Sequence, residues 1–265
     1  IIISILGIEM SAVHAADVEK PQKNYPKAIL FSAILLILFS VVGVLSIAMV
    51  VPKTQLLLSA GCLQAFAFFF HALNIKSLIP WIAIIITLGG LGSLATWIIG
   101  PAKGLIAAAQ KENLPDFLRK KNGEGVPRNF LIAQAIFVSI LAIAFLFMPT
   151  VNSAYWVFMV LTTQLYLVMY LLLFGAAIKL RYTHPDTPRP FQVPGGKKGM
   201  WVFGVIGLLS SIFALIVCFF PPAQMGVGEG TTYFWTLIGA IFALVSLPFW
   251  ISKFRTKKQE SVHDN

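Results

Sequence analysis

Charged residues are scarce in this sequence. Only 11% of its 265 residues are Asp, Glu, Lys or Arg, while 58% are hydrophobic, and a soluble protein carries roughly 25% charged residues. This composition excludes an ordinary soluble domain. Because long apolar runs separate the charged segments, we expect an all-α integral membrane protein whose main partner is the lipid bilayer.

Residues that perform chemistry are also sparse. Cys62 and Cys218 have no CxxC spacing and fall in or beside apolar segments, which indicates packing cysteines. His184 and His263 fall in polar loop or tail. The sequence has no HExxH or GxSxG motif and no paired acids within an apolar run. We therefore expect no enzyme activity, no catalytic residue, no cofactor and no metal site.

Six apolar stretches are long enough to cross a membrane, which takes about 20 residues. They cover 28–51, 78–99, 129–148, 154–179, 200–220 and 232–252. The opening segment, 1–16, is apolar only to Ile8 and is typical of the end of a helix, so we expect a piece of a longer protein or the product of a truncated reading frame. Residues 55–74 are apolar but carry Gln64, His71 and Asn74, and we expect a helix along or dipping into the outer surface.

The basic residues indicate the orientation of these spans. The net charge is +10, which in a soluble chain would suggest a nucleic-acid partner. If the spans alternate, however, every Lys and Arg except Lys53 and Lys76 lies on one side. Such a bias identifies the cytoplasmic side. We therefore expect no nucleic-acid partner and a cytoplasmic C-terminus.

Glu9 is the one acid that falls in an apolar environment. A carboxylate there is costly unless it meets a cavity, a partner or a proton, which favours a functional role; a helix cap is the alternative. Gly7 and Ser11 around it indicate a break from which a new helix starts, a geometry that exposes backbone groups to substrates or ions. His14, five residues later, is a candidate pH sensor, or a structural histidine.

Two predicted spans carry further candidate residues. In 78–99, Ser93 and several glycines allow a close approach of another backbone, and the large ring of Trp97 beside them indicates a gate or a substrate platform. In 154–179, Thr163, Tyr166 and Tyr170 share one helix face. Their depth favours either a wet cavity or a hydrogen bond between helices.

Several short motifs together carry a family resemblance. The stretch GIEMSAVHAADVEKPQKNYPKAI resembles the sixth-helix signature of amino acid, polyamine and organocation permeases, and looks most like that of the bacterial glutamate:GABA antiporters. The resemblance continues in order through the segments VGVLSIAMVVP, SLATWIIGPAKG, AQKENLP, GVP, HPD and VPGGK. It covers essentially the whole chain.

The resemblance implies the C-terminal part of a LeuT-like transporter with two five-helix inverted repeats and two extra helices. Residues 1–179 would form the second repeat, from the end of helix six to helix ten, and 180–265 would form helices eleven and twelve with a short cytoplasmic tail. The partner would be an N-terminal half with helices one to five, and the location would be the bacterial inner membrane.

By the same resemblance, Glu9 would couple proton state or gating to the substrate, and Gly7, Trp97, Tyr166, Tyr170, Thr163 and Ser93 would belong to the substrate path. The expected function is exchange of glutamate for GABA, with protons possibly taking part, and the isolated piece would be inactive. An antiporter for another amino acid or amine is the alternative, as is a permease-derived sensor that does not transport. Ser93 stands where the family can carry an acid, which weakens glutamate specificity, and the tail after Ser252 is short for an acid-released plug.

Overall fold

Most of the chain that the structure describes is helical. The computed structural model describes residues 6–52, 60–109, 118, 122–123, 126–144, 150–189, 191–220 and 230–263. The elements are two 3-10 helices, η1 (Ile8–Asp17) and η2 (Lys76–Leu78), and the helices α2 (Pro21–Val50), α3 (Gly61–Ala72), α4 (Ile79–Ala109), α6 (Arg128–Ala144), α7 (Val151–Thr183), α8 (Gly196–Val217) and α9 (Gly230–His263). No strand occurs among these residues, so the all-α prediction is confirmed.

Among the described residues, five helices are long and apolar enough to cross a membrane. They are Pro21–Val50, Lys76–Leu105, Ser153–Thr183, Gly196–Val217 and Thr231–Trp250. Each corresponds to one of the predicted spans, which supports a multi-pass membrane protein. For the sixth predicted span, 129–148, the described residues form the shorter helix α6, and positions 145–149 lie outside the described residues.

Some helix boundaries differ from those predicted. Helix α2 begins at Pro21, with proline in the first turn where its missing N–H costs nothing. The segment between the opening residues 1–16 and the predicted span 28–51 is therefore helical from Pro21 onward. Helix α4 continues through Pro101 to Ala109 instead of ending near residue 99. The segment 55–74 does contain a helix, the 12-residue α3, which packs against α4.

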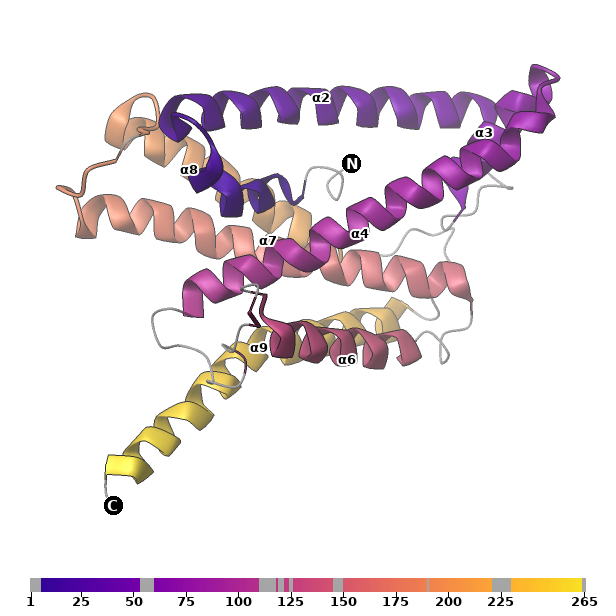
Figure 1. The fold of residues 1–265 in the computed structure, drawn as a ribbon. Coiled ribbons are helices and arrows are strands. Elements are labelled where there is room, and N and C mark those ends of the chain that lie inside the picture. The colour runs from indigo at the N-terminus through magenta and orange to yellow at the C-terminus, as the bar shows by residue number, and fades with distance from the viewer. Residues whose placement is uncertain are drawn as a thin grey trace.

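Helix α7 is the centre of the packing (Figure 1), with α8 along one side of it. Small residues allow this close contact. A Cβ on Gly207 would lie 2.5 Å from the Phe174 ring, and one on Gly204 would lie 2.8 Å from Ile178. Ser211 is 5% exposed and donates a hydrogen bond to the Gly207 carbonyl oxygen. Small residues at such spacing let helix backbones approach closely in a membrane.

Another face of α7 packs on α9. Val160 and Leu161 of α7 form a buried cluster with Tyr233 and Leu237 of α9. The Tyr233 hydroxyl donates a hydrogen bond of 3.1 Å to the carbonyl oxygen of Cys218, just after α8. This bond ties the beginning of α9 to the end of α8, so the three helices form one packed unit.

The glycine contact predicts a stability difference between two alanine variants. We expect Gly207→Ala to destabilise the protein by about 1–3 kcal/mol, since the new methyl group overlaps Phe174. The matched control is Gly239→Ala on α9, where nothing lies within 4 Å of the new Cβ and the loss of glycine flexibility stabilises a helix by up to ~1 kcal/mol. The measurement is unfolding by SDS titration in mixed micelles; equal midpoints for the two variants would contradict the packing.

Candidate functional site

At the break predicted near Glu9 the structure describes the start of the new helix, at Gly7, while residues 1–5 lie outside the described residues. Gly7 has a φ of 97° and precedes the 3-10 helix η1, with Glu9 in its first turn. The left-handed conformation is accessible mainly to glycine. The new helix therefore starts where the sequence indicates, although it is a 3-10 helix and begins at Ile8. Ser11 donates to the Ile8 carbonyl oxygen, and its hydroxyl also lies 2.9 Å from that of Tyr25 on α2.

The break packs directly on α4. A Cβ on Gly7 would lie 2.6 Å from the Trp97 indole, and one on Gly100 would lie 2.5 Å from the end of Met10. Gly7 is thus required both by its φ and by Trp97. At the earlier glycines no close neighbour is found among the described residues, since nothing lies within 4 Å of a Cβ at Gly89, Gly90 or Gly92, and the close approach that they allow stays a prediction.

Glu9 bonds across the fold to α7. The Tyr170 hydroxyl donates a hydrogen bond of 2.7 Å to Oε2 of Glu9, between residues 161 positions apart. The other oxygen, Oε1, is buried and has no hydrogen-bond partner among the described residues. A buried acceptor without a partner is costly, so Glu9 presents one carboxyl oxygen for a further group.

An aromatic row extends from Trp97 along α7. The Trp97 and Tyr166 rings meet edge to face at 5.8 Å and 88°, and Tyr166 contacts Tyr170 at 6.3 Å. Tyr170 in turn contacts Phe174 at 6.4 Å. We call Gly7, Glu9, Trp97, Tyr166 and Tyr170 the break cluster, because these residues join the helix break to α4 and α7.

Comparison with known proteins gives the family. The amino acid permease family model matches residues 1–241. This chain belongs to the amino acid permease family. An uncharacterized transporter of Legionella pneumophila is 38% identical over 253 residues, covering 96% of this chain and 54% of that protein. A glutamate/gamma-aminobutyrate antiporter of Lactococcus lactis is 36% identical over 260 residues, covering 97% of this chain and 52% of that protein.

A more distant relative is named for different substrates. A probable agmatine/putrescine antiporter of Lactococcus lactis is 26% identical over 246 residues, covering 92% of this chain and 52% of that protein. The chain therefore spans about half the length of the curated relatives that it matches. Membership of a permease family indicates a transporter rather than an enzyme.

The remaining candidates of this permease are Thr163, Ser93 and His14. Thr163 is 6% exposed and donates back to the Met159 carbonyl oxygen within α7. Ser93 is exposed on α4, one turn before Trp97. His14 lies on η1, but its side chain is outside the described residues. For these three residues the path and sensing roles stay predictions.

Two residues of α7 were missed by the sequence reasoning. Phe174 extends the aromatic row, and its spacing of four from Tyr170 was an available signal. Gln164 is 0% exposed, and neither atom of its amide has a hydrogen-bond partner among the described residues. A glutamine in the middle of an apolar span was the available signal there.

The hydrogen bond between Glu9 and Tyr170 predicts a measurable coupling energy. In a double-mutant cycle of Glu9→Ala and Tyr170→Phe, we expect the two effects on unfolding free energy to be non-additive by about 0.5–3 kcal/mol, the range for one hydrogen bond. Tyr166→Phe with Glu9→Ala is the matched control, because no hydrogen bond is found between these side chains in the described structure, and its coupling should be smaller. Additive effects for Glu9 and Tyr170 would show that the bond contributes nothing to stability.

Proposed function

We propose that this chain is part of a secondary active amino acid antiporter that exchanges glutamate for GABA by alternating access. The observation that supports the proposal is the break cluster. In it the start of η1 and one intramembrane carboxylate meet aromatic side chains from two spans, α4 and α7. Broken helices with polar groups near the midplane are typical of transporter binding sites. The substrate pair is supported by the relative of Lactococcus lactis that is named for it.

Each residue of the break cluster has a distinct proposed role. Gly7 allows the break, and its backbone contributes to the substrate path. Trp97 and Tyr166 form the aromatic wall of that path, and Trp97 remains 41% exposed in the structure. Tyr170 positions Glu9 through their hydrogen bond. Thr163 and Ser93 extend the path, and His14 is the candidate sensor of pH.

Glu9 is the proposed link between protons and transport. In the structure its Oε2 accepts a hydrogen bond from Tyr170, which a carboxylate oxygen does without a proton of its own. Protonation at the buried Oε1 would remove the charge of the carboxylate and turn this oxygen from an acceptor into an O–H donor. The proton state of Glu9 would therefore change how strongly η1 is held on α7, which makes exchange pH-dependent.

A second candidate is exchange of another amino acid or an amine. It is favoured by the relative named for agmatine and putrescine and by the neutral Ser93, where the family can carry an acid. A membrane sensor derived from a permease would bind the same ligands without moving them. In either case we propose that 1–179 form the second inverted repeat and that 180–265 form the last two helices and the tail.

Exchange in proteoliposomes tests the proposed function. We expect the whole gene product to exchange labelled external glutamate for internal GABA, and Trp97→Ala to lower the rate at least tenfold because it removes the aromatic wall. The matched control is Trp81→Ala, also on α4, whose side chain is 66% exposed and outside the break cluster. We expect the 265 residues alone not to exchange, since they match about half of the relatives.

The outcomes of this assay separate the candidates. Exchange of another pair in a substrate panel, but not of glutamate for GABA, would favour the second antiporter. Ligand binding without flux at any pH would favour the sensor. Equal loss of activity in Trp81→Ala and Trp97→Ala would remove the argument for a specific path at Trp97.

The basic segments predict the orientation in the bacterial inner membrane. We propose a cytoplasmic C-terminus, because all Lys and Arg residues except Lys53 and Lys76 then face the cytoplasm. A green fluorescent protein fused after Asn265 should fluoresce, whereas alkaline phosphatase at the same position should be inactive. A fusion after Lys53 should behave in the opposite way. Active phosphatase at the C-terminus would reverse the proposed orientation.

A further inference from the structure

Cationic and aromatic side chains meet where α7 ends and α8 begins. The Trp201 Nε1–H of α8 donates a hydrogen bond of 2.6 Å to the Tyr182 hydroxyl of α7. The Lys197 ammonium group lies 5.7 Å from the centre of the Tyr182 ring, within the range of a cation–π contact. Lys198 follows on α8 and is exposed. We call Tyr182, Lys197, Lys198 and Trp201 the α7–α8 patch.

The Tyr182 hydroxyl has a proton left to donate. Its oxygen accepts from Trp201, so the phenolic O–H remains available as a donor, and no acceptor for it is found among the described residues. The side chain is 55% exposed. Lys197 and Lys198 likewise have no acidic partner in the described part of the chain. The α7–α8 patch therefore presents one O–H donor and two ammonium groups to an anion from outside the chain.

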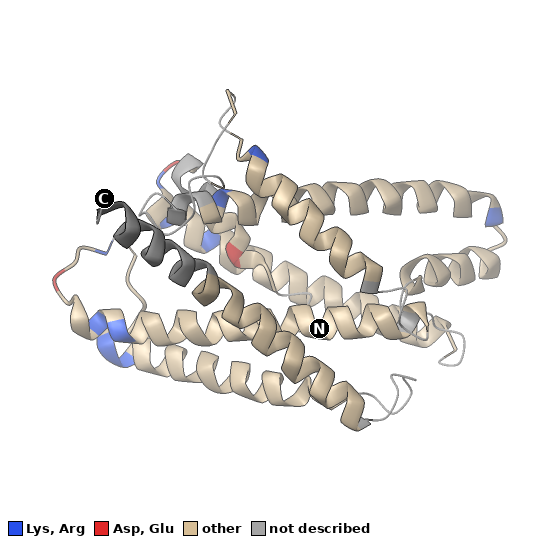
Figure 2. Cartoon of the chain, turned by 90° about the horizontal axis from the view of Figure 1, so that it is seen from below, with Lys and Arg blue, Asp and Glu red and all other residues tan. Residues whose placement is uncertain are grey.

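The surroundings of the α7–α8 patch are also positive. Basic residues gather at this end of the two helices (Figure 2), and Lys179 and Arg181 are those of α7. Arg189 is used within the chain, because it donates to two backbone carbonyl oxygens around the end of α7. The sequence from 125 to 228 contains six basic residues and one acid, Asp186. Such an excess of positive charge beside a span attracts anionic lipid headgroups.

Large apolar side chains continue from the patch along one face of α8. Val202, Ile206, Leu209 and Phe213 recur at a spacing of three or four and are between 56% and 71% exposed. We call this the outer face of α8. The glycines of the helix that make close contacts lie against α7 instead. Because membrane helices approach each other closely over small residues, the large side chains of the outer face favour an acyl chain over another helix.

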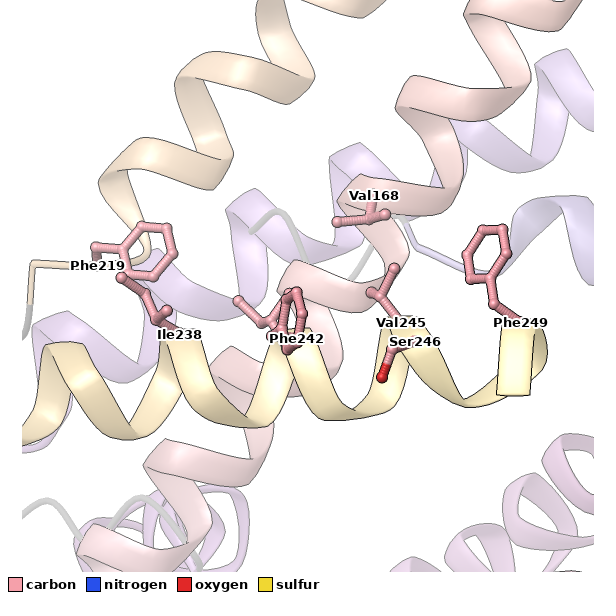
Figure 3. Close-up of a pocket in the computed structure, with 8 residues that line it drawn as sticks. Val168, Phe219, Ile238, Phe242, Val245, Ser246 and Phe249 are labelled. Atoms are coloured by element: carbon pink, nitrogen blue, oxygen red, sulfur yellow. The ribbon is translucent and has the colours of Figure 1, made fainter. Parts of the chain in front are cut away.

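The apolar groove along α9 lacks the polar part of such a site. It is lined by Val168 of α7, by Phe219 and by α9 residues from Ile238 to Phe249 (Figure 3). None of its lining residues is charged. The α7–α8 patch differs because described cations and an apolar face adjoin there on one helix, in the order in which a phospholipid carries its anionic group and its acyl chains.

We propose that the α7–α8 patch binds the phosphate group of one anionic phospholipid, whose acyl chains lie along the outer face of α8. The phosphate oxygens accept hydrogen bonds from the Tyr182 O–H and from the ammonium groups of Lys197 and Lys198. Trp201 positions the Tyr182 hydroxyl, and both residue types are typical of a membrane interface. The inference does not depend on transport activity, so its failure and a failure of the exchange assay are separate results.

Photocrosslinking of the whole gene product in phosphatidylcholine vesicles tests the headgroup contact. The probes are phosphatidylglycerol and phosphatidylcholine with identical acyl chains, each carrying a diazirine near the glycerol group. We expect adducts on 201–206 in about fivefold or higher yield with phosphatidylglycerol. Replacing Lys197 and Lys198 by Gln should reduce this difference to below about twofold. The matched control replaces Lys23 and Lys27 of α2 by Gln and should leave the difference unchanged.

The Tyr182 donor is tested separately by Tyr182→Phe, which keeps the aromatic ring beside Lys197 and removes the O–H. We expect the preference for phosphatidylglycerol to fall about twofold or more, because one hydrogen bond to a charged group is lost. Tyr155→Phe, at the opposite end of α7 and 36% exposed, is the matched control and should leave the preference unchanged. If Tyr182→Phe fails to fold by circular dichroism, the adduct map of the unmodified protein still decides.

Several results would overturn the proposal. Equal yields of the two lipids on 201–206 would remove the headgroup preference, and an unchanged preference without Lys197 and Lys198 would place the phosphate group elsewhere. Absence of adducts from this segment in the whole gene product would show that protein covers the patch. Loss of the preference on addition of glycerol phosphate in solution would assign the patch to a soluble phosphate compound.

Discussion

The need to satisfy every backbone polar group without water governs this fold. In hydrocarbon an unpaired N–H or C=O costs several kcal/mol, so a spanning chain stays helical. The exception at Gly7 is therefore confined to a few residues and is supported locally. Met10 donates its N–H to the Gly7 carbonyl oxygen, and Ser11 donates to that of Ile8. The chain is held here because one backbone donor and one side-chain donor of the next turn bond to these two carbonyl oxygens.

Helix α7 organises the described structure because its faces meet different partners. Tyr166 and Tyr170 face η1 and α4, Phe174 and Ile178 face the glycines of α8, and Val160 and Leu161 face α9. A change in the contact between η1 and Tyr170 therefore acts on α7, the helix against which α8 and α9 also pack. This gives the proposed proton step at Glu9 a physical route to a larger movement of the helices.

The sequence predicted what depends on local pattern, and missed what depends on tertiary contact. Span length predicted α2, α4, α7, α8 and α9, and a spacing of four placed Tyr166 and Tyr170 on one face. Their bond and ring contacts with Glu9 and Trp97 join elements far apart in the sequence, so no local period contains them. The open surroundings of Gly89 and Gly92 show the same limit, because a small residue permits a close approach but does not bring a neighbour.

Glu9 and Gln164 each have a buried side-chain oxygen without a hydrogen-bond partner among the described residues, and they differ in what they require. Gln164 is neutral, and an unbonded buried amide costs a few kcal/mol. In the transporter proposed above, Glu9 would offset the cost of its buried carboxyl oxygen by taking a proton or by meeting a cationic group. Its free Oε1 lies beside the helix break, where a substrate amine would reach it in the proposed transporter. Proton and substrate would then compete for one oxygen atom, and such competition couples their movements without a second carboxylate.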